Sequence, residues 1–294
     1  MQQDEILRII DRKLLLKKIS LWRVISILLL VVFIFNLLYQ DVTRSTGAAF
    51  IAEVKINGFI DDNSYRNKKL LELATNKKIK AVIVNIDSPG GSFVGGERLY
   101  NNLRKISEQK PVIAVLGNIA TSAAYLTALG ADYIVASQGT ITGSVGVLLQ
   151  SAELTNLADK LGIKPVIIKS SSFKAVPNFA EKINIEQQDY LQDLINQSSE
   201  IFYNLVLERR IDLAEEVKQE VKLGKIFIGK SALAMNLIDE LGDIESAKLW
   251  LKKQNIKIDK VKEFNLEKKD HQIKSLLKGF FIPNIESSLK LLAI

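Results

Sequence analysis

The chain has 294 residues, of which 47% are hydrophobic and 25% are charged, and its net charge is +7. This length and hydrophobic content suffice for one large globular domain or two small ones. The absence of cysteine excludes disulfides, thiolate metal sites and cysteine nucleophiles. The positive charge is concentrated at the two ends, and zinc-finger spacing, RNP-like motifs and phosphate-binding glycine loops are absent. We therefore predict no nucleic-acid partner, no metal and no cofactor.

An uncharged apolar run over residues 24–39 comes after a basic stretch that ends at Arg23. With the apolar residues just before it, this run approaches the roughly 20 residues that a membrane-spanning helix needs. The positive-inside rule then predicts a cytoplasmic segment over residues 1–20, a transmembrane anchor over 21–40, and an extracytoplasmic location for residues 41–294. A cleaved signal peptide is an alternative, because residues 45–49 are small, and a buried core helix is a third.

After this run, short apolar segments alternate with segments of helical spacing. The predicted strands cover residues 51–56, 81–86, 111–116, 133–136, 145–149 and 165–168. The predicted helices between them cover residues 63–76, 93–107, 120–129 and 154–161. Continuous apolar strands that alternate with helices indicate an α/β fold, in which helices cover both faces of a largely parallel sheet.

The second half of the chain is more helical. Residues 185–217 predict one long helix or two joined helices, and a short element at 226–229 and a helix at 230–235 come next. The lysine-rich end predicts a strand at 256–264 and an amphipathic helix at 273–281. We assign residues 41–250 to one globular domain and residues 251–294 to a basic C-terminal extension, which is a solvated tail, a membrane contact or a lid.

Ser122 is the first candidate for catalysis. It comes directly after an apolar strand and opens a predicted helix of small residues, where its hydroxyl and a backbone N–H can face the same substrate. A serine nucleophile needs a base, which is usually histidine. The one histidine, His271, lies in a polar lysine-rich stretch, so it is a poor candidate. The ordinary alternative for Ser122 is a helix cap or a packing residue.

Lys174 is the candidate base. A solvated lysine is almost entirely protonated at pH 7, so a catalytic lysine must be buried enough to lower its pKa. The apolar residues around it are candidate walls for such a pocket, namely Phe173, Ala175, Val176 and Phe179.

Gly90 and Gly91 are candidate oxyanion residues. They end a buried strand, and glycines there let backbone N–H groups turn toward an oxyanion. The alternative for Gly90 and Gly91 is an ordinary tight turn, and the alternative for Lys174 is a solvated loop lysine.

The conjunction and order of these segments resemble the signal peptide peptidase A family of membrane-bound serine peptidases, over about residues 50–245. The matching segments are Asp87-Ser-Pro-Gly-Gly-Ser92, Ala120-Thr-Ser-Ala-Ala-Tyr125, Thr142-Gly-Ser-Val-Gly-Val147 and Ser170-Ser-Ser-Phe-Lys174. The resemblance implies a Clp-protease/crotonase-like core with an N-terminal transmembrane helix. It also implies site roles: Ser122 as nucleophile, Lys174 as general base, Gly90 or Gly91 with Ala123 as oxyanion donors, and Ser144 as a residue that orients the lysine.

Two features depart from the family pattern. Ala123 and Ala124 stand where glycines are expected after the nucleophile, and Ser171 stands for the glycine of the lysine loop. Alanine still supplies a backbone N–H, but a turn that requires positive φ costs it about 1 kcal/mol or more. The proposed oxyanion role of Ala123 therefore survives the departure.

The resemblance implies a single-pass endopeptidase of the bacterial inner membrane. Its partners would be signal peptides or other hydrophobic peptide substrates, the membrane, and further copies in a homo-oligomeric ring whose dyad joins serine and lysine from neighbouring protomers. Three alternatives remain open: a protease for a membrane partner protein such as a stomatin-like protein, a catalytically silent membrane scaffold, and a crotonase-like acyl-CoA enzyme.

Overall fold

The computed structural model describes residues 23, 25–35, 48–258 and 260–267. The chain divides into two units, residues 1–49 and 50–294. In the first unit, residues 23 and 25–35 are helical. Within the described residues, no helix combines the length and the apolar character that crossing a membrane requires. The predicted anchor over 21–40 lies partly outside the described residues and stays a prediction.

The described part of the second unit contains an eight-stranded sheet with the order β6-β5-β3-β2-β1-β8, in which β4 pairs with β3 and β7 pairs with β4. The strands are β1 (Phe50–Asn57), β2 (Ile79–Ser88), β3 (Val112–Thr121), β4 (Tyr133–Ala136), β5 (Ile141–Gly143), β6 (Ile226–Ile228), β7 (Glu240–Leu241) and β8 (Val261–Phe264). The pairings are parallel, except that β5 and β6 are antiparallel. The predicted α/β fold with a parallel sheet is confirmed.

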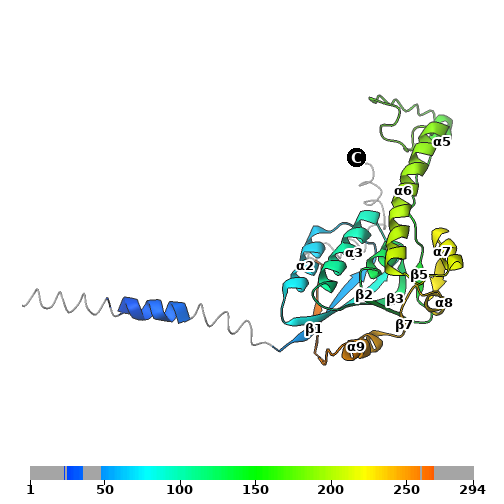
Figure 1. The fold of residues 1–294 in the computed structure, drawn as a ribbon. Coiled ribbons are helices and arrows are strands. Elements are labelled where there is room, and N and C mark those ends of the chain that lie inside the picture. The colour runs from blue at the N-terminus through cyan, green and yellow to red at the C-terminus, as the bar shows by residue number, and fades with distance from the viewer. Residues whose placement is uncertain (1–22, 24, 36–47, 259, 268–294) are drawn as a thin grey trace, which may run out of the picture. The chain divides into compact units, whose positions relative to one another are not determined.

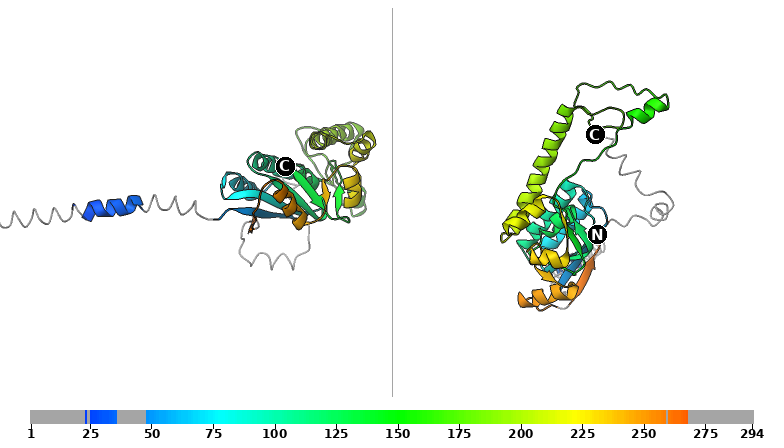
Figure 2. Two further views of the ribbon diagram at one scale, coloured as in Figure 1. Left: turned by 60° about the horizontal axis from the view of Figure 1, so that its bottom comes forward. Right: turned by 90° about the vertical axis from the view of Figure 1, so that its right-hand side faces the viewer.

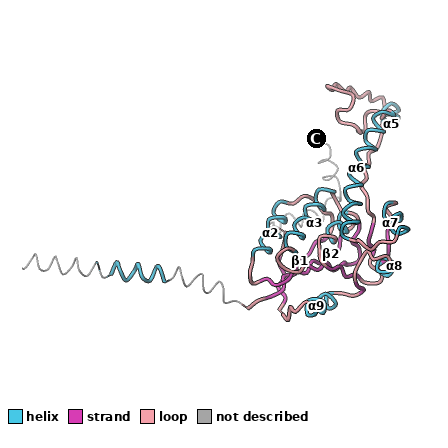
Figure 3. The backbone as a smooth tube through the Cα atoms, viewed as in Figure 1, coloured by secondary structure: helices cyan, strands magenta, loops and turns pink. Residues whose placement is uncertain are grey.

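Alternation along the strands sends side chains into cores on both faces of the sheet. On one face, α2 (Ser64–Thr75), α3 (Phe93–Ser107) and α4 (Ala123–Ala128) cover the larger core. On the other face, α9 (Ile244–Lys253) packs Ala247 and Leu251 against Ile51, Ile83 and Ile113. Figure 1 and Figure 3 show α2 and α3 on one side of the strands and α9 on the other. The residues that follow β2 and β3 lie at the carboxyl ends of these two neighbouring parallel strands.

Helix α6 (Ile185–Arg209) connects this core to an extension. Phe202 and Val206, in its second half, are buried in the larger core. The segment that precedes α6, including α5 (Thr155–Lys160), lies at the opposite end of α6, away from the sheet (Figure 1, Figure 2). We call residues 147–197 the arm; most of its side chains are exposed.

Two predicted strands do not form. Residues 145–149 have no strand, because the strand in this region is β5, which ends at Gly143. Residues 165–168 have none either, and Val166 and Ile168 are 83% and 95% exposed. A strand needs a neighbour for its backbone hydrogen bonds, and the arm offers this apolar segment no partner strand within the described part of the chain.

The C-terminal half agrees with the prediction, with smaller corrections. The predicted helical segment 185–217 contains α6 and the start of α7 (Glu215–Lys222), which extends five residues further, and another helix, α8 (Gly229–Ala234), comes after β6. Helix α9 was not predicted; the Asp243 side chain caps it by accepting from the N–H groups of Glu245 at 2.9 Å and Ser246 at 3.3 Å. The predicted strand at 256–264 is shorter, as β8. The predicted helix at 273–281 and His271 lie outside the described residues.

Candidate active site

Ser122 stands where β3 meets α4. The first part of β3 pairs with β4, and its last residues, Ile119–Thr121, pair with β5 instead. Ser122 then adopts φ 54° and ψ −125°, a backbone conformation that costs a non-glycine residue of the order of 1–3 kcal/mol. A strained strand-to-helix turn of this kind exposes the serine hydroxyl at the end of a sheet, as in the nucleophile elbow of other hydrolases.

Hydrogen bonds hold this turn through the backbone and leave the hydroxyl available. The Ser122 N–H donates to the Gly143 carbonyl at 2.9 Å, and the Ser122 carbonyl accepts from the Leu126 N–H at 2.9 Å. The side chain of Ser122 is half-buried and makes no capping hydrogen bond to α4. The alternative of a helix-capping serine is therefore wrong for this side chain.

Gly90 and Gly91 lie in the loop after β2, which closes on Ser122. A Cβ atom on Gly90, whose φ is +110°, would come within 2.9 Å of the Ser122 Cβ and the Thr121 carbonyl oxygen. A Cβ atom on Gly91 would lie 2.0 Å from the Ile60 carbonyl oxygen. Both positions therefore require glycine, because any side chain would collide with fixed backbone.

The two glycines differ in what their amides do. The Gly90 N–H donates to the Ser88 Oγ at 3.0 Å. Ile60 donates its N–H to the Gly90 carbonyl at 2.9 Å and accepts from the Ser92 N–H at 2.8 Å. In such a parallel bridge the central residue, Gly91, points its own amide away from Ile60. Within the described residues, the N–H groups of Gly91 and Ala123 have no acceptor.

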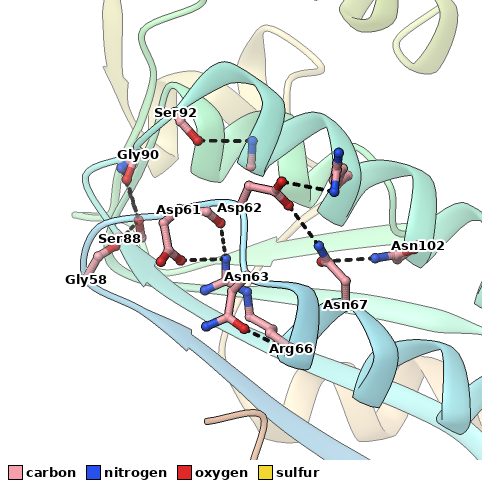
Figure 4. Close-up of polar contacts among 12 residues, drawn as sticks. Gly58, Asp61, Asp62, Asn63, Arg66, Asn67, Ser88, Gly90, Ser92 and Asn102 are labelled. Carbon is pink, nitrogen blue, oxygen red and sulfur yellow. Dashed lines mark hydrogen bonds and ion pairs between the residues drawn. The ribbon is translucent and has the colours of Figure 1, made fainter. Parts of the chain in front are cut away.

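Two hydroxyls that sequence reasoning did not single out fix this loop. The Ser88 Oγ donates to the Gly58 carbonyl at 2.6 Å, which ties the end of β2 to the end of β1 (Figure 4). The Thr121 Oγ1 donates to the Pro89 carbonyl at 3.0 Å, which ties the glycine loop to the residue before the nucleophile. Their position directly before Pro-Gly-Gly and before Ser122 was the signal available in the sequence.

Ser144 lies close to the Ser122 turn along the backbone. It is the residue directly after Gly143, which accepts the Ser122 N–H, and its own N–H donates to the Lys225 carbonyl at 2.8 Å. Like Ser122 it has a positive φ, 56°. The structure thus brings Ser122, Ala123, Ser144 and the glycine loop together at one end of the sheet.

Lys174 does not lie beside Ser122 in the same chain. It is exposed, and its segment lies in the arm at the end of α6 that is away from the sheet (Figure 1). The apolar pocket that we expected around it does not form within the described part of the chain, since Phe173 and Phe179 are 39% and 43% exposed. Phe173 instead packs edge-on against Tyr190, with 5.2 Å between ring centroids. One chain alone therefore leaves Lys174 as a solvated residue.

The loop that carries Lys174 is nevertheless held by polar contacts. The buried side chain of Gln187, in the first turn of α6, donates from Nε2 to the Ser172 carbonyl at 2.6 Å. Lys169 and Glu181 form an ion pair of 2.6 Å, and the hydrogen bond from Lys169 holds the pKa of Glu181 below its usual value. These contacts give the lysine loop a defined shape.

The arrangement around Ser122 suits acyl transfer at a carbonyl carbon. It combines a hydroxyl that does not cap its helix and two backbone amides that can bind a developing oxyanion. The described residues contain no group of three or more His, Asp or Glu side chains placed to hold a metal ion. What one chain, as far as the structure describes it, does not place beside Ser122 is a general base.

Comparisons with known proteins agree with this chemistry. The model of peptidase family S49 matches residues 104–258, and that of the Clp protease family matches residues 49–138. A candidate protease of Synechocystis sp. is 38% identical over 201 residues, which cover 68% of this chain and 72% of the relative. One of Methanocaldococcus jannaschii is 30% identical over 237 residues, 80% and 74% of the two chains. A candidate signal peptide peptidase of Enterococcus faecium is 27% identical over 218 residues, 69% and 63% of the two chains.

Proposed function

Because this chain belongs to peptidase family S49 and is a serine protease, we propose that Ser122 is its nucleophile and Lys174 its general base. The observation that carries the proposal is the strained turn at Ser122, with φ 54°, packed against the Gly90–Gly91 loop. Membership in a protease family decides against the acyl-CoA enzyme and the silent scaffold.

The proposed reaction proceeds by acyl transfer. The Ser122 Oγ forms a bond to the carbonyl carbon of the scissile peptide while its proton passes to a neutral Lys174 Nζ. The N–H groups of Gly91 and Ala123 stabilise the oxyanion, and Ser144 orients the lysine. Lys174 then protonates the leaving amine as the C–N bond breaks. A water molecule, deprotonated by Lys174, releases the acyl group.

We propose that the lysine comes from a neighbouring copy in a homo-oligomeric ring. The arm, which includes Lys174, extends from the end of α6 that lies away from the sheet of the same chain (Figure 2). Exposed apolar residues in the arm, such as Val166 at 83% and Ile168 at 95%, indicate a surface that another chain covers. Such contact would also supply the apolar surroundings that a neutral lysine requires.

The proposed substrate class rests on the proposed anchor. A transmembrane helix over residues 21–40 would hold the catalytic domain, residues 41–250, at the outer surface of the bacterial inner membrane. Hydrophobic peptides such as cleaved signal peptides partition there, and a relative carries the name signal peptide peptidase. A membrane partner protein is a second substrate class. The basic extension, residues 251–294, would face anionic lipid headgroups.

Hydrolysis of a fluorogenic signal-peptide-like substrate by the full chain in detergent micelles, between pH 6 and 10, tests the proposal. Ser122→Ala and Lys174→Ala should each abolish turnover. Lys164→Ala, which removes another exposed lysine of the arm, should leave it unchanged. Activity retained in Lys174→Ala would refute the dyad, and activity retained in Ser122→Ala would refute the nucleophile.

A further inference from the structure

We infer that Arg66 is a positioning residue for the oxyanion loop, which we define as residues 88–92. This inference rests on the proposed role of the Gly91 amide. Arg66 lies in the first turn of α2, yet it is only 5% exposed. An arginine is always charged, so its burial requires strong partners. The partners are both on Asp61: Nη2 donates to the Asp61 backbone carbonyl and, at 3.1 Å, to its carboxylate (Figure 4).

Asp61 is the residue after Ile60, and Ile60 is the template on which the oxyanion loop lies. The fully buried Ile60 bonds Gly90 on one side of Gly91 and Ser92 on the other, at 2.9 and 2.8 Å. The loop cannot move relative to Ile60 without breaking one of these two bonds. The direction of the Gly91 amide is therefore set by the position of Ile60, and the 61–62 peptide, one unit further along the chain, helps to hold that position.

The Asp61 carbonyl is held from two sides. On the side of α3, a Cβ atom on Gly95 would lie 2.8 Å from this oxygen, so the start of α3 is already in close contact with it. On the side of α2, the guanidinium of Arg66 binds it. The Asp61 carboxylate is 62% exposed, so its own ion pair with Arg66 contributes little. The bond that matters is the one from the buried guanidinium to the backbone carbonyl.

Catalysis depends on the position of the Gly91 amide. An oxyanion donor is effective only within about 2.7–3.1 Å of the developing charge, and a shift of about 1 Å can lower turnover about 100-fold. Without Arg66, the Asp61 carbonyl loses its partner and the 61–62 peptide, which carries this carbonyl, can rotate. The oxyanion loop would then move with it, and the Gly91 amide would leave its position. The contacts that bind the rest of the substrate lie away from this loop, so substrate affinity would change little.

Steady-state kinetics on the full chain test this inference. We expect Arg66→Gln to lower kcat by about 10- to 100-fold with KM within about threefold, because the defect lies in the transition state. Arg66→Lys, which keeps one donor for the carbonyl, should restore part of kcat. Asp61→Asn keeps the carbonyl and should lose less than Arg66→Gln. Arg98→Gln, which breaks the neighbouring 2.9 Å ion pair with Asp62, is the matched control and should resemble the wild type.

Hydrogen exchange gives a readout that does not depend on activity. The amides of Ile60 and Ser92 should exchange faster in Arg66→Gln than in Arg98→Gln, while amides in the centre of β2 remain equally protected. An Arg66→Gln enzyme with the kcat of the wild type would overturn the inference, and so would unchanged exchange at Ile60 and Ser92 in this variant. If the wild type shows no Ser122-dependent hydrolysis, the proposed function fails, and the exchange data alone decide whether Arg66 holds the loop.

Discussion

The Ser122 N–H donates a hydrogen bond of 2.9 Å to the carbonyl of Gly143, at the end of β5. Gly143 has φ +88°, and a Cβ atom there would lie 2.8 Å from the Lys225 carbonyl oxygen. Gly90, in the oxyanion loop after β2, contacts Ser122. The strained conformation of the proposed nucleophile is thus fixed between two glycine turns on neighbouring strands. Changes at these glycines should therefore affect catalysis even though they leave the hydroxyl in place.

Substitution of Gly91 tests the oxyanion loop. In Gly91→Ala the new Cβ atom would lie 2.0 Å from the Ile60 carbonyl oxygen, so the loop must move and the amide with it. We expect kcat to fall by about 100-fold or more, as for the loss of an oxyanion donor. Gly139→Ala is the control, because nothing lies within 4 Å of its added Cβ atom. A Gly91→Ala enzyme with the kcat of Gly139→Ala would show that this amide has no catalytic role.

Mixed oligomers test whether Lys174 acts on a neighbouring chain. Ser122→Ala and Lys174→Ala are each expected to be inactive, but a mixed ring contains sites where an intact Ser122 meets an intact Lys174 from the adjacent copy. Random assembly of equal amounts should restore about one quarter of wild-type turnover. The measurement is peptide hydrolysis after the two variants are co-expressed. Complete inactivity of mixed rings, shown by mass to contain both variants, would place serine and lysine in the same chain.

The sequence predicted the central sheet and its first helices well, because their apolar periodicity is strong. The predicted helix at 93–107 coincides with α3, and the predicted strand at 81–86 lies inside β2. The junction at Ser122 was less accurate: the helix was predicted from residue 120, whereas β3 runs to Thr121. The last residues of β3 stay extended because they pair with β5, and this long-range pairing is invisible in a local pattern.

The arm marks the limit of sequence reasoning. The apolar segments at 145–149 and 165–168 have the composition of buried strands, yet the described part of the chain gives them no sheet to join. The sequence therefore located the lysine motif but not its surroundings. The contribution of Arg66 was also hidden, because a single arginine in the first turn of a polar helix gives no sign that its guanidinium is buried against a backbone carbonyl.

Charges introduced into the arm test the proposed assembly. Ile168 is 95% exposed in one chain, and burial of an isoleucine side chain contributes about 1.5–3 kcal/mol. We expect Ile168→Asp to dissociate the oligomer and to lower Ser122-dependent hydrolysis with it. Ile211→Asp, at an 80% exposed position outside the arm, should leave both unchanged. Analytical ultracentrifugation in detergent measures the mass. An Ile168→Asp protein with wild-type mass and activity would mean that this part of the arm contacts no other chain.

Tyr125 should make the stability of the catalytic domain depend on alkaline pH. It lies three residues after Ser122 in α4, is fully buried, and donates its hydroxyl to the Leu237 carbonyl at 2.8 Å. Burial raises the pKa of Tyr125 from its ordinary value of 10.0 to about 12. Below pH 10 the phenol is protonated in both the folded and the unfolded chain, so it causes no pH dependence. Between about pH 10 and 12 only the unfolded chain releases the proton, so the free energy of unfolding falls, by roughly 2–3 kcal/mol in total.

Chemical denaturation at pH 8, 10.5 and 11.5 measures this effect. At pH 8, Tyr125→Phe should be less stable than the wild type by about 1 kcal/mol, because the Leu237 carbonyl loses its donor. The phenylalanine cannot ionise, so its disadvantage should shrink as pH rises, disappear slightly above pH 10.5 and be reversed at pH 11.5. Tyr190→Phe, at a position that is 56% exposed, should track the wild type at every pH. A difference between Tyr125→Phe and wild type that stays constant with pH would show that the buried phenol does not oppose ionisation, and that the packing behind the Ser122 turn admits water.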